Sequence, residues 1–331
     1  MIENRVQAPR GGLSGEQSVG DPEGFAAKVE EVLAPLRKPQ KRISSKYHYD
    51  ARGSELFEEI TRLDEYYPTR TERGLLKRWM PAWVKELRPA TLVELGAGNS
   101  EKSRIILDAM VEDVGAAVYA PVDVSADFLN ETAELLQEEY PQLDIEPVVA
   151  DILHPLDLPP ELPSPHWIAF LGSTLGNFEP NESTMLLRTI ANRMAPCDRF
   201  LLGVDLRPGP HKSAERIELA YNDPAGVTSE FSVNVLAVLN EEVGTDFDPS
   251  GFRHRSFYSA ENGRIETYLD SVRDQVVTFP GGETVSFREG EETRTEISCK
   301  YDRPTIDDLF KRAGLSVDRW VEDDQGYYAL V

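Results

Sequence analysis

Apolar and polar residues follow two alternating patterns along the middle of this chain. Short apolar runs, of the kind that form buried strands, alternate with stretches in which apolar residues recur every three or four positions, as on one face of a helix. This alternation predicts a parallel sheet covered by helices on both faces, with a ligand site where the strand ends converge. The strands are expected at 91–95, 117–122, 145–150, 167–171 and 200–204, and the helices at 101–111, 126–139 and 180–194.

The segments before this repeat have a different pattern. Residues 1–22 are rich in Gly, Ser and Gln and lack periodicity, which predicts a disordered tail. Helical spacing then follows at 25–36, 56–63 and 71–87.

After the repeat, the chain predicts an antiparallel insert. Asn262-Gly263 and Gly281-Gly282 are turn signals between strand-like runs, and two helical segments precede those runs. A last helix and two apolar strands are expected to rejoin the first sheet as a hairpin. The segments are the helices near 211–222, 224–242 and 304–313, and the strands at 255–260, 264–272, 275–279, 283–287, 292–301, 316–321 and 327–331.

Composition narrows the class of protein. The 331 residues, 40% of them hydrophobic, suffice for two folded domains. The net charge of -23 repels phosphate backbones and anionic lipids, so nucleic acid and membrane are poor partners. The sequence shows no apolar h-region and no eighteen-residue apolar run, so we expect a cytoplasmic protein, and we expect a monomer. Cys197, Cys299 and the five histidines show no metal-type spacing. No metal site is therefore expected, and both cysteines are interpreted as reduced core residues.

The segment VELGAGNSEKSR, residues 93–104, leads from a predicted strand through Gly96 and Gly98 into a helix. Glycines at a strand exit let the backbone approach a ligand, and the free N–H groups of the helix suit a polar ligand. Glu101 stands where a dinucleotide fingerprint has its third glycine, which disfavours a nicotinamide-dependent dehydrogenase. S-adenosylmethionine (AdoMet) methyltransferases also use a Glu-x-Gly-x-Gly turn and tolerate that change. A turn without a ligand is the alternative.

Polar residues follow the next strands. Asp123 can accept both ribose hydroxyls of an adenosine, with an N-cap role as the alternative. Asp151 can accept an adenine amino group, with Ile152 against the ring. Asn177, in FLGSTLGNFEP, offers one acceptor and two donors for the amine and carboxylate of an amino acid, although an Asx-turn explains it equally well.

The segment TRTEISCKY, residues 293–301, alternates between polar and apolar residues. A period of two places Glu296, Ser298 and Lys300 on one face of a strand. A carboxylate and a hydroxyl two residues apart form a clamp for a small group such as an imidazole. A solvated strand face is the alternative.

Six segments in this order resemble the histidine-specific, AdoMet-dependent methyltransferases of ergothioneine biosynthesis, over most of residues 46–331. The resemblance implies AdoMet as methyl donor, L-histidine as substrate and Nα-trimethylation to the betaine hercynine. It also implies an α/β fold, with a Rossmann-like class I sheet of seven strands that ends in an antiparallel hairpin. The segments are KYHYDARGSELFEEIT, EYYPTRTE, LVELGAGNSEKSR, FLGSTLGN, AYNDPAGVTSEFSVNVL and TEISCKY.

The expected division is an AdoMet-binding domain at 70–205 plus 302–331 and an α+β substrate-binding domain at 23–69 plus 206–301. The resemblance implies that Asn177 and Tyr221 hold the amine and carboxylate of histidine, with Asn177 and Tyr49 as catalytic residues. Thr267 stands near the imidazole, where some relatives have Met. The implied cofactor contacts are Tyr66, Gly96, Lys102, Asp123, Asp151 and Ile152, and the implied histidine contacts are Tyr49, Tyr66, Asn177, Tyr221, Thr267, Glu296 and Ser298.

Alternative functions follow from the same residues. Tryptophan or another aromatic amino acid is the alternative substrate, but the related fungal enzymes that methylate tryptophan derivatives lack the Glu296/Ser298 pair. A dehydrogenase and a catalytically silent AdoMet-binding protein are the alternatives from other classes.

Overall fold

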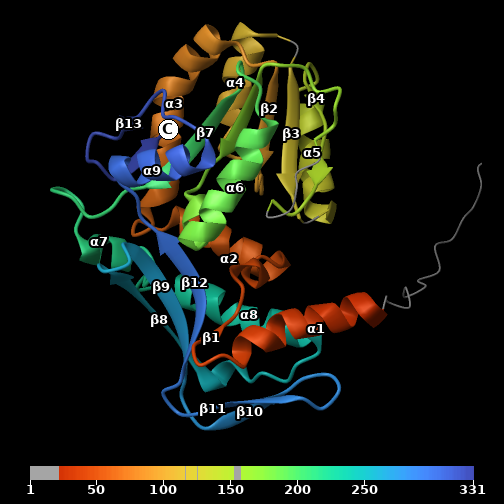
Figure 1. Ribbon diagram of the computed structural model, residues 1–331, viewed down its shortest axis with the longest axis vertical. Coiled ribbons are helices and arrows are strands. Elements are labelled where there is room, and N and C mark those ends of the chain that lie inside the picture. The colour runs from red at the N-terminus through yellow and green to blue at the C-terminus, as the bar shows by residue number, and fades with distance from the viewer. Residues whose placement is uncertain (1–21, 116, 125, 153–157) are drawn as a thin grey trace, which may run out of the picture.

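The computed structural model describes residues 22–115, 117–124, 126–152 and 158–331. The expected tail therefore lies outside the described residues up to residue 21, and helix α1 begins at Pro22. The described chain forms a larger sheet flanked by helices, a smaller four-stranded sheet beneath it, and a two-stranded hairpin (Figure 1).

The larger sheet has eight strands in the order β13-β14-β7-β6-β2-β3-β4, with β5 also paired to β3. Strands β2 to β7 are parallel, and β14 and β13 are antiparallel additions at one edge. The strands are β2 (Thr91–Leu95), β3 (Val118–Asp123), β4 (Asp144–Ile145), β5 (Val148–Val149), β6 (His166–Phe170), β7 (Arg199–Asp205), β13 (Val321–Glu322) and β14 (Tyr328–Leu330).

Two strands differ from their expected extents. The strand expected at 145–150 is split into β4 and β5, which brings the sheet to eight strands instead of the expected seven. Pro147 lies at the break, and proline has no N–H for a sheet ladder. Of the strand expected at 316–321, only its last residue pairs, in β13.

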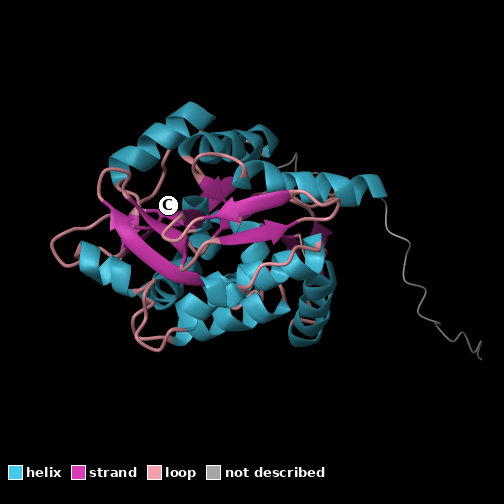
Figure 2. Ribbon diagram, turned by 90° about the horizontal axis from the view of Figure 1, so that it is seen from below, coloured by secondary structure: helices cyan, strands magenta, loops and turns pink. Residues whose placement is uncertain are grey.

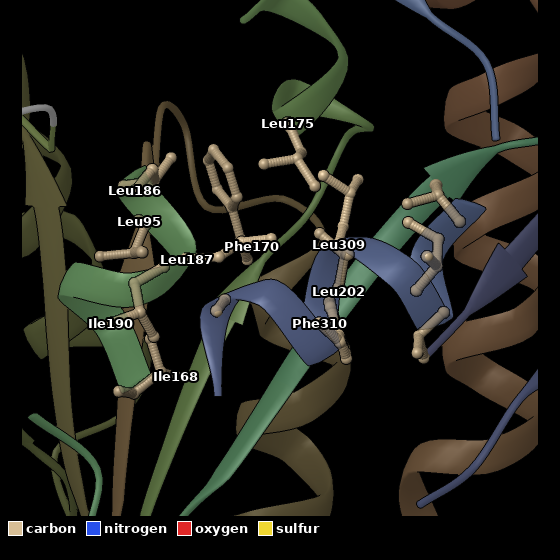
Figure 3. Close-up of a cluster of buried hydrophobic side chains, with 14 of the residues drawn as sticks. Leu95, Ile168, Phe170, Leu175, Leu186, Leu187, Ile190, Leu202, Leu309 and Phe310 are labelled. Carbon is tan, nitrogen blue, oxygen red and sulfur yellow. The ribbon is translucent and has the colours of Figure 1, made fainter. Parts of the chain in front are cut away.

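Helices cover both faces of this sheet because successive residues of a strand point to opposite sides. In β2, Val93 and Leu95 belong to the core beneath α6 and α9, whereas Leu92 belongs to the core beneath α3 and α4. Figure 3 shows the first of these cores, in which residues of α6 and α9 surround Phe170 and Leu202. The helices are α3 (Tyr67–Leu87), α4 (Ser103–Asp113), α5 (Ala126–Glu139), α6 (Pro180–Arg193) and α9 (Arg303–Ala313).

The smaller sheet has the order β1-β12-β9-β8, and its strands β8, β9 and β12 are antiparallel, as expected for the insert. The two-residue strand β1 was not predicted and runs parallel to β12. Helices lie around these strands as well as around the larger sheet (Figure 2). The elements are β1 (Lys41–Arg42), β8 (Phe252–Ser259), β9 (Arg264–Ser271), β12 (Glu292–Cys299), the separate hairpin β10 (Gln275–Thr278) and β11 (Thr284–Phe287), and helices α1 (Pro22–Leu36), α2 (Ala51–Arg62), α7 (Ala214–Leu219) and α8 (Val227–Val243).

Direct contacts join the two sheets. The 3-10 turn Thr174–Asn177, at the end of β6, packs against β12 so closely that a Cβ at Gly176 would lie 2.7 Å from the Cys299 carbonyl oxygen. Glu179, one turn further, accepts hydrogen bonds from Arg264 of β9 and Arg294 of β12. The carboxyl end of β6 therefore lies against β12.

Candidate active site

The glycine loop after β2 adopts a backbone that only glycine takes readily. Gly96 and Gly98 have φ of +67° and +53°, and a Cβ at either would meet no atom within 4 Å. The need for glycine is therefore conformational rather than steric. The Gly98 N–H donates to the Asp123 carboxylate at 3.3 Å, which ties the loop to the end of β3.

Asp123 and Asp151 lie at neighbouring strand ends. The Ala150 N–H donates to the Asp123 carbonyl at 3.0 Å, so the residue that follows Ala150 is held beside β3. Both aspartates are half-buried, and Ile152 packs against the edge of the core under α6. The structure thus places Gly98, Asp123 and Asp151 at neighbouring strand ends, and their contacts with a cofactor stay a prediction.

Lys102 is held by a buried partner that the sequence did not reveal. Its ammonium donates to the Glu72 carboxylate at 2.8 Å, and Glu72 is fully buried in α3. The same carboxylate accepts the Gly172 N–H and the Tyr328 hydroxyl, each at 2.8 Å. Glu72 was detectable only as the last residue of EYYPTRTE, and the cofactor contact expected for Lys102 stays a prediction.

The glutamate of the glycine motif is also buried. Glu94 accepts hydrogen bonds from the hydroxyls of Ser103 and Tyr119. Burial raises its pKa to about 7, against the opposing effect of these hydrogen bonds. This carboxyl group therefore fixes the start of α4 from inside the sheet.

A β-bulge decides which way the clamp residues of β12 face. Arg294 lies opposite Tyr268, but Glu296 lies opposite Thr267, so Thr295 is the extra residue and the expected strict alternation is broken there. From Glu296 onward the alternation holds, and Ser298 lies opposite Ile265. Glu296 and Ser298 therefore share a face with Thr267, as expected from their spacing.

The Glu296 carboxylate is half-buried and accepts no hydrogen bond from any described residue. Burial raises its pKa to about 7, and the charge of nearby Lys300 acts in the opposite direction. A buried carboxylate that lacks a protein partner is costly, so it is suited to an N–H donor from a ligand.

Beside Glu296, a hydrogen-bonded network connects the predicted Tyr221 and Ser298 to charged groups. The Tyr221 hydroxyl donates to Ser298 Oγ at 2.9 Å, and Lys300 Nζ donates to both hydroxyl oxygens at 2.8 Å. Lys300 also pairs with Asp205 at 2.8 Å, the last residue of β7. The roles of Asp205, Lys212 and Lys300 were missed. Asp205 and Lys300 follow strand-like runs and Lys212 lies in a polar segment, and none of these contexts signals a buried ion pair.

Asp205 forms ion pairs with two lysines, Lys300 and Lys212. Lys212, fully buried, contacts it as well, and the Tyr67 hydroxyl donates to it at 2.9 Å. Burial would raise the pKa of Asp205, but Lys212 and Lys300 lower it below its usual value. Burial lowers the pKa of Lys212 to about 8, although Asp205 opposes this.

Aromatic rings line the region between the glycine loop and β12. Tyr66 is buried, and its ring meets those of Tyr221 and Phe57 edge to face at 6.2 Å. Tyr49 is 45% exposed and meets Phe57 and Phe231 at 5.8 Å. Burial is the largest cause that raises the pKa of Tyr49. The nearby Glu296, Tyr221 and Asp123 raise this pKa further. Tyr49 therefore lies between the predicted cofactor and substrate residues.

Asn177 and Thr267 complete the set of predicted residues. Asn177 is half-buried beside β12, and its side-chain amide has no hydrogen bond with the part of the chain that the structure describes. An Asx-turn does not explain it. Thr267 is buried, and its hydroxyl is hydrogen-bonded to Ser256 Oγ at 2.9 Å.

Other expectations concern metal, cysteines and membrane. Within the described ranges, no cluster of His, Cys, Asp and Glu has the composition of a metal site. Both cysteines are free, but Cys197 is exposed in the short loop before β7 and is not the core residue expected. None of the described helices is long and apolar enough to cross a membrane.

Comparison with known proteins gives similarities along nearly the whole chain. The family of histidine-specific, SAM-dependent methyltransferases matches residues 28–331. A histidine N-alpha-methyltransferase of Mycobacterium tuberculosis is 39% identical over 94% of this chain and 96% of its own length. Its counterpart in Mycolicibacterium smegmatis is 38% identical over 91% and 92%. Ergothioneine biosynthesis protein 1 of Neurospora crassa is 31% identical over 88% of this chain and 33% of its own length.

Proposed function

The chain belongs to the family of histidine-specific, AdoMet-dependent methyltransferases, and on this premise we propose that it trimethylates the α-amine of L-histidine to hercynine in ergothioneine biosynthesis. The observation that carries the proposal is the half-buried Glu296 carboxylate, which has no hydrogen-bond partner among the described residues and adjoins the Ser298 hydroxyl. A carboxylate acceptor beside a hydroxyl donor matches an imidazole, which has one N–H and one nitrogen lone pair.

The other end of the substrate has its own partners. Asn177, with no side-chain hydrogen bond among the described residues, can accept from the α-amine and donate to the carboxylate. The Tyr221 hydroxyl donates to Ser298 at 2.9 Å, and its oxygen can accept a hydrogen bond from the α-amine. Tyr49 and Tyr66 would pack around the amine. The raised pKa of each keeps the hydroxyl protonated at neutral pH, so it acts as a hydrogen-bonding group and not as a strong base.

The residues of the glycine loop fit AdoMet. A Cβ at Gly96 or Gly98 would meet only open space, which leaves their backbone accessible to a ligand. Asp123 would accept the ribose hydroxyls, and Asp151 the adenine amino group beside Ile152. Lys102, held by Glu72, would add a positive charge near the methionine carboxylate. AdoMet supplies an activated methyl group when bound, so the protein chiefly orients the amine and excludes water.

The proposal extends to organisation. Residues 70–205 plus 302–331 would hold AdoMet, and residues 23–69 plus 206–301 would hold histidine. A monomer without nucleic-acid or membrane partners is supported by the net charge of -23.

Mass spectrometry tests the proposed reaction. Purified protein is incubated with AdoMet and an equimolar mixture of L-histidine and L-tryptophan, and methylated species of both are quantified over time. We expect mono-, di- and trimethylhistidine and little methyltryptophan. Binding of AdoMet without methylated histidine, or preferential methylation of tryptophan, would overturn the proposal.

A further inference from the structure

Lys300 is a buried lysine whose hydrogen-bonding capacity is fully used inside the protein. It is 1% exposed and follows directly after β12. Its ammonium lies 2.8 Å from each of three acceptors, the oxygens of Tyr221, Ser298 and Asp205. An ammonium has three hydrogens and no lone pair, so these partners leave none for a ligand. Lys300 can therefore influence a ligand only through its partners.

The ammonium fixes the polarity of the two hydroxyl groups. Because Lys300 can only donate, the oxygens of both Tyr221 and Ser298 must accept from it. The two hydroxyls share one further hydrogen bond at 2.9 Å, in which Tyr221 donates to Ser298. Ser298 Oγ then accepts two hydrogen bonds, and no described residue accepts its own hydrogen. Reversing the shared bond frees the Tyr221 hydrogen instead, so the pair offers one donor in either case.

We propose that Lys300 is a positioning residue that makes the Tyr221–Ser298 pair a hydrogen-bond donor toward the substrate ring. This inference rests on the proposed function. Beside the donor lies the Glu296 carboxylate, which can only accept when ionised. The two together fit a ring with one N–H and one lone pair, which is the neutral imidazole. A ring without nitrogen satisfies neither group.

Lys212 provides a matched comparison within the same network. It too is buried and pairs with Asp205, but its other partners are the carbonyl oxygens of Leu206 and Tyr327. Among the described residues it makes no hydrogen bond to Tyr221 or Ser298. A role of Lys300 that was merely structural would be shared by Lys212, whereas control of the hydroxyl pair would not.

The test measures discrimination between two substrates by Lys300→Met and Lys212→Met. L-histidine is compared with β-(2-thienyl)alanine, whose ring has a similar size and no nitrogen, and the ratio of their kcat/KM values is determined. Loss of one charge-controlled hydrogen bond should lower this ratio about tenfold or more in Lys300→Met, mainly through the KM of histidine. We expect the ratio of Lys212→Met to stay within about twofold of the wild type, and AdoMet affinity to be preserved in Lys300→Met.

A double-mutant cycle then locates the effect. If Lys300 acts through the hydroxyl pair, Lys300→Met should change the ratio little in a Ser298→Ala background. An unchanged ratio in Lys300→Met, an equal fall in Lys212→Met, or full additivity with Ser298→Ala would each overturn the inference. If Lys300→Met does not fold, Lys300→Leu, which also lacks donor hydrogens, takes its place, and an unchanged ratio overturns the inference in the same way. Absence of histidine methylation by the wild type would instead refute the proposed function.

Discussion

Replacing Glu296 by glutamine tests the imidazole clamp most directly. The substitution Glu296→Gln keeps the volume and position of the side chain and removes its negative charge. In the proposed complex the carboxylate accepts the imidazole N–H, and no described residue competes for it. Glutamine can still present its carbonyl oxygen, so the loss is limited to the charge-assisted part of the hydrogen bond.

The magnitude follows from the burial of this group. A hydrogen bond to a charged group contributes about 1.5 to 3 kcal/mol and one between neutral groups about 0.5 to 1.5 kcal/mol, so loss of the charge removes about 1 to 1.5 kcal/mol. Since about 1.4 kcal/mol corresponds to a factor of ten, the KM for histidine should rise by about 5- to 12-fold. The AdoMet dissociation constant should change by less than about twofold, because the cofactor residues lie at the ends of β2, β3 and β5.

Steady-state methyl transfer with varied histidine gives KM, and isothermal titration gives the AdoMet affinity. Glu292→Gln is the matched control, because Glu292 lies on the same strand, is exposed and pairs with Arg255. This control should leave both quantities near their wild-type values. An equal loss of histidine and AdoMet affinity in Glu296→Gln, or an unchanged histidine KM, would refute the assignment of Glu296 to the imidazole.

Three further results are expected. Because the pKa of Glu296 is about 7, the wild-type kcat/KM for histidine relative to that of Glu296→Gln should rise as pH increases from 6 to 8, and a flat ratio would contradict an ionised clamp. Asp123→Asn should weaken AdoMet binding about tenfold or more by calorimetry, whereas Asp144→Asn, exposed on β4, should not; equal effects would remove Asp123 from the cofactor site. Gly203→Ala would place a Cβ 2.0 Å from Glu72 Oε1 and should lower Tm by several degrees. Gly74→Ala in α3 is the control, because its Cβ would meet no atom within 4 Å, and equal Tm values of the two variants would refute this packing.

Much of the larger sheet was predictable because each βα unit is local. The strand expected at 91–95 is β2 with the same limits, and the helix expected at 126–139 is α5. Strand β1 escaped prediction because it consists of Lys41 and Arg42, which carry no apolar pattern and pair only because β12 offers an edge. Short strands whose pairing depends on a distant partner leave little trace in a local pattern.

The predicted site residues come from segments that the fold brings together. The glycine loop, Asp123 and Asp151 could be predicted because strand ends in a parallel sheet converge. The buried charges of Glu72, Asp205 and Lys300 could not. Charged residues are stable inside a protein only when paired, and their partners lie on other elements.

The sequence by itself determined the order of strands and helices, the glycine loop, and the spacing that groups Glu296 with Ser298. Only the tertiary structure decided the face on which that pair lies, through the bulge at Thr295. It also decided that the Lys300 ammonium donates its three hydrogens to Tyr221, Ser298 and Asp205. The physical reason is that a period of two is the same for either face of a strand, whereas register and the pairing of buried charges depend on residues far away along the chain.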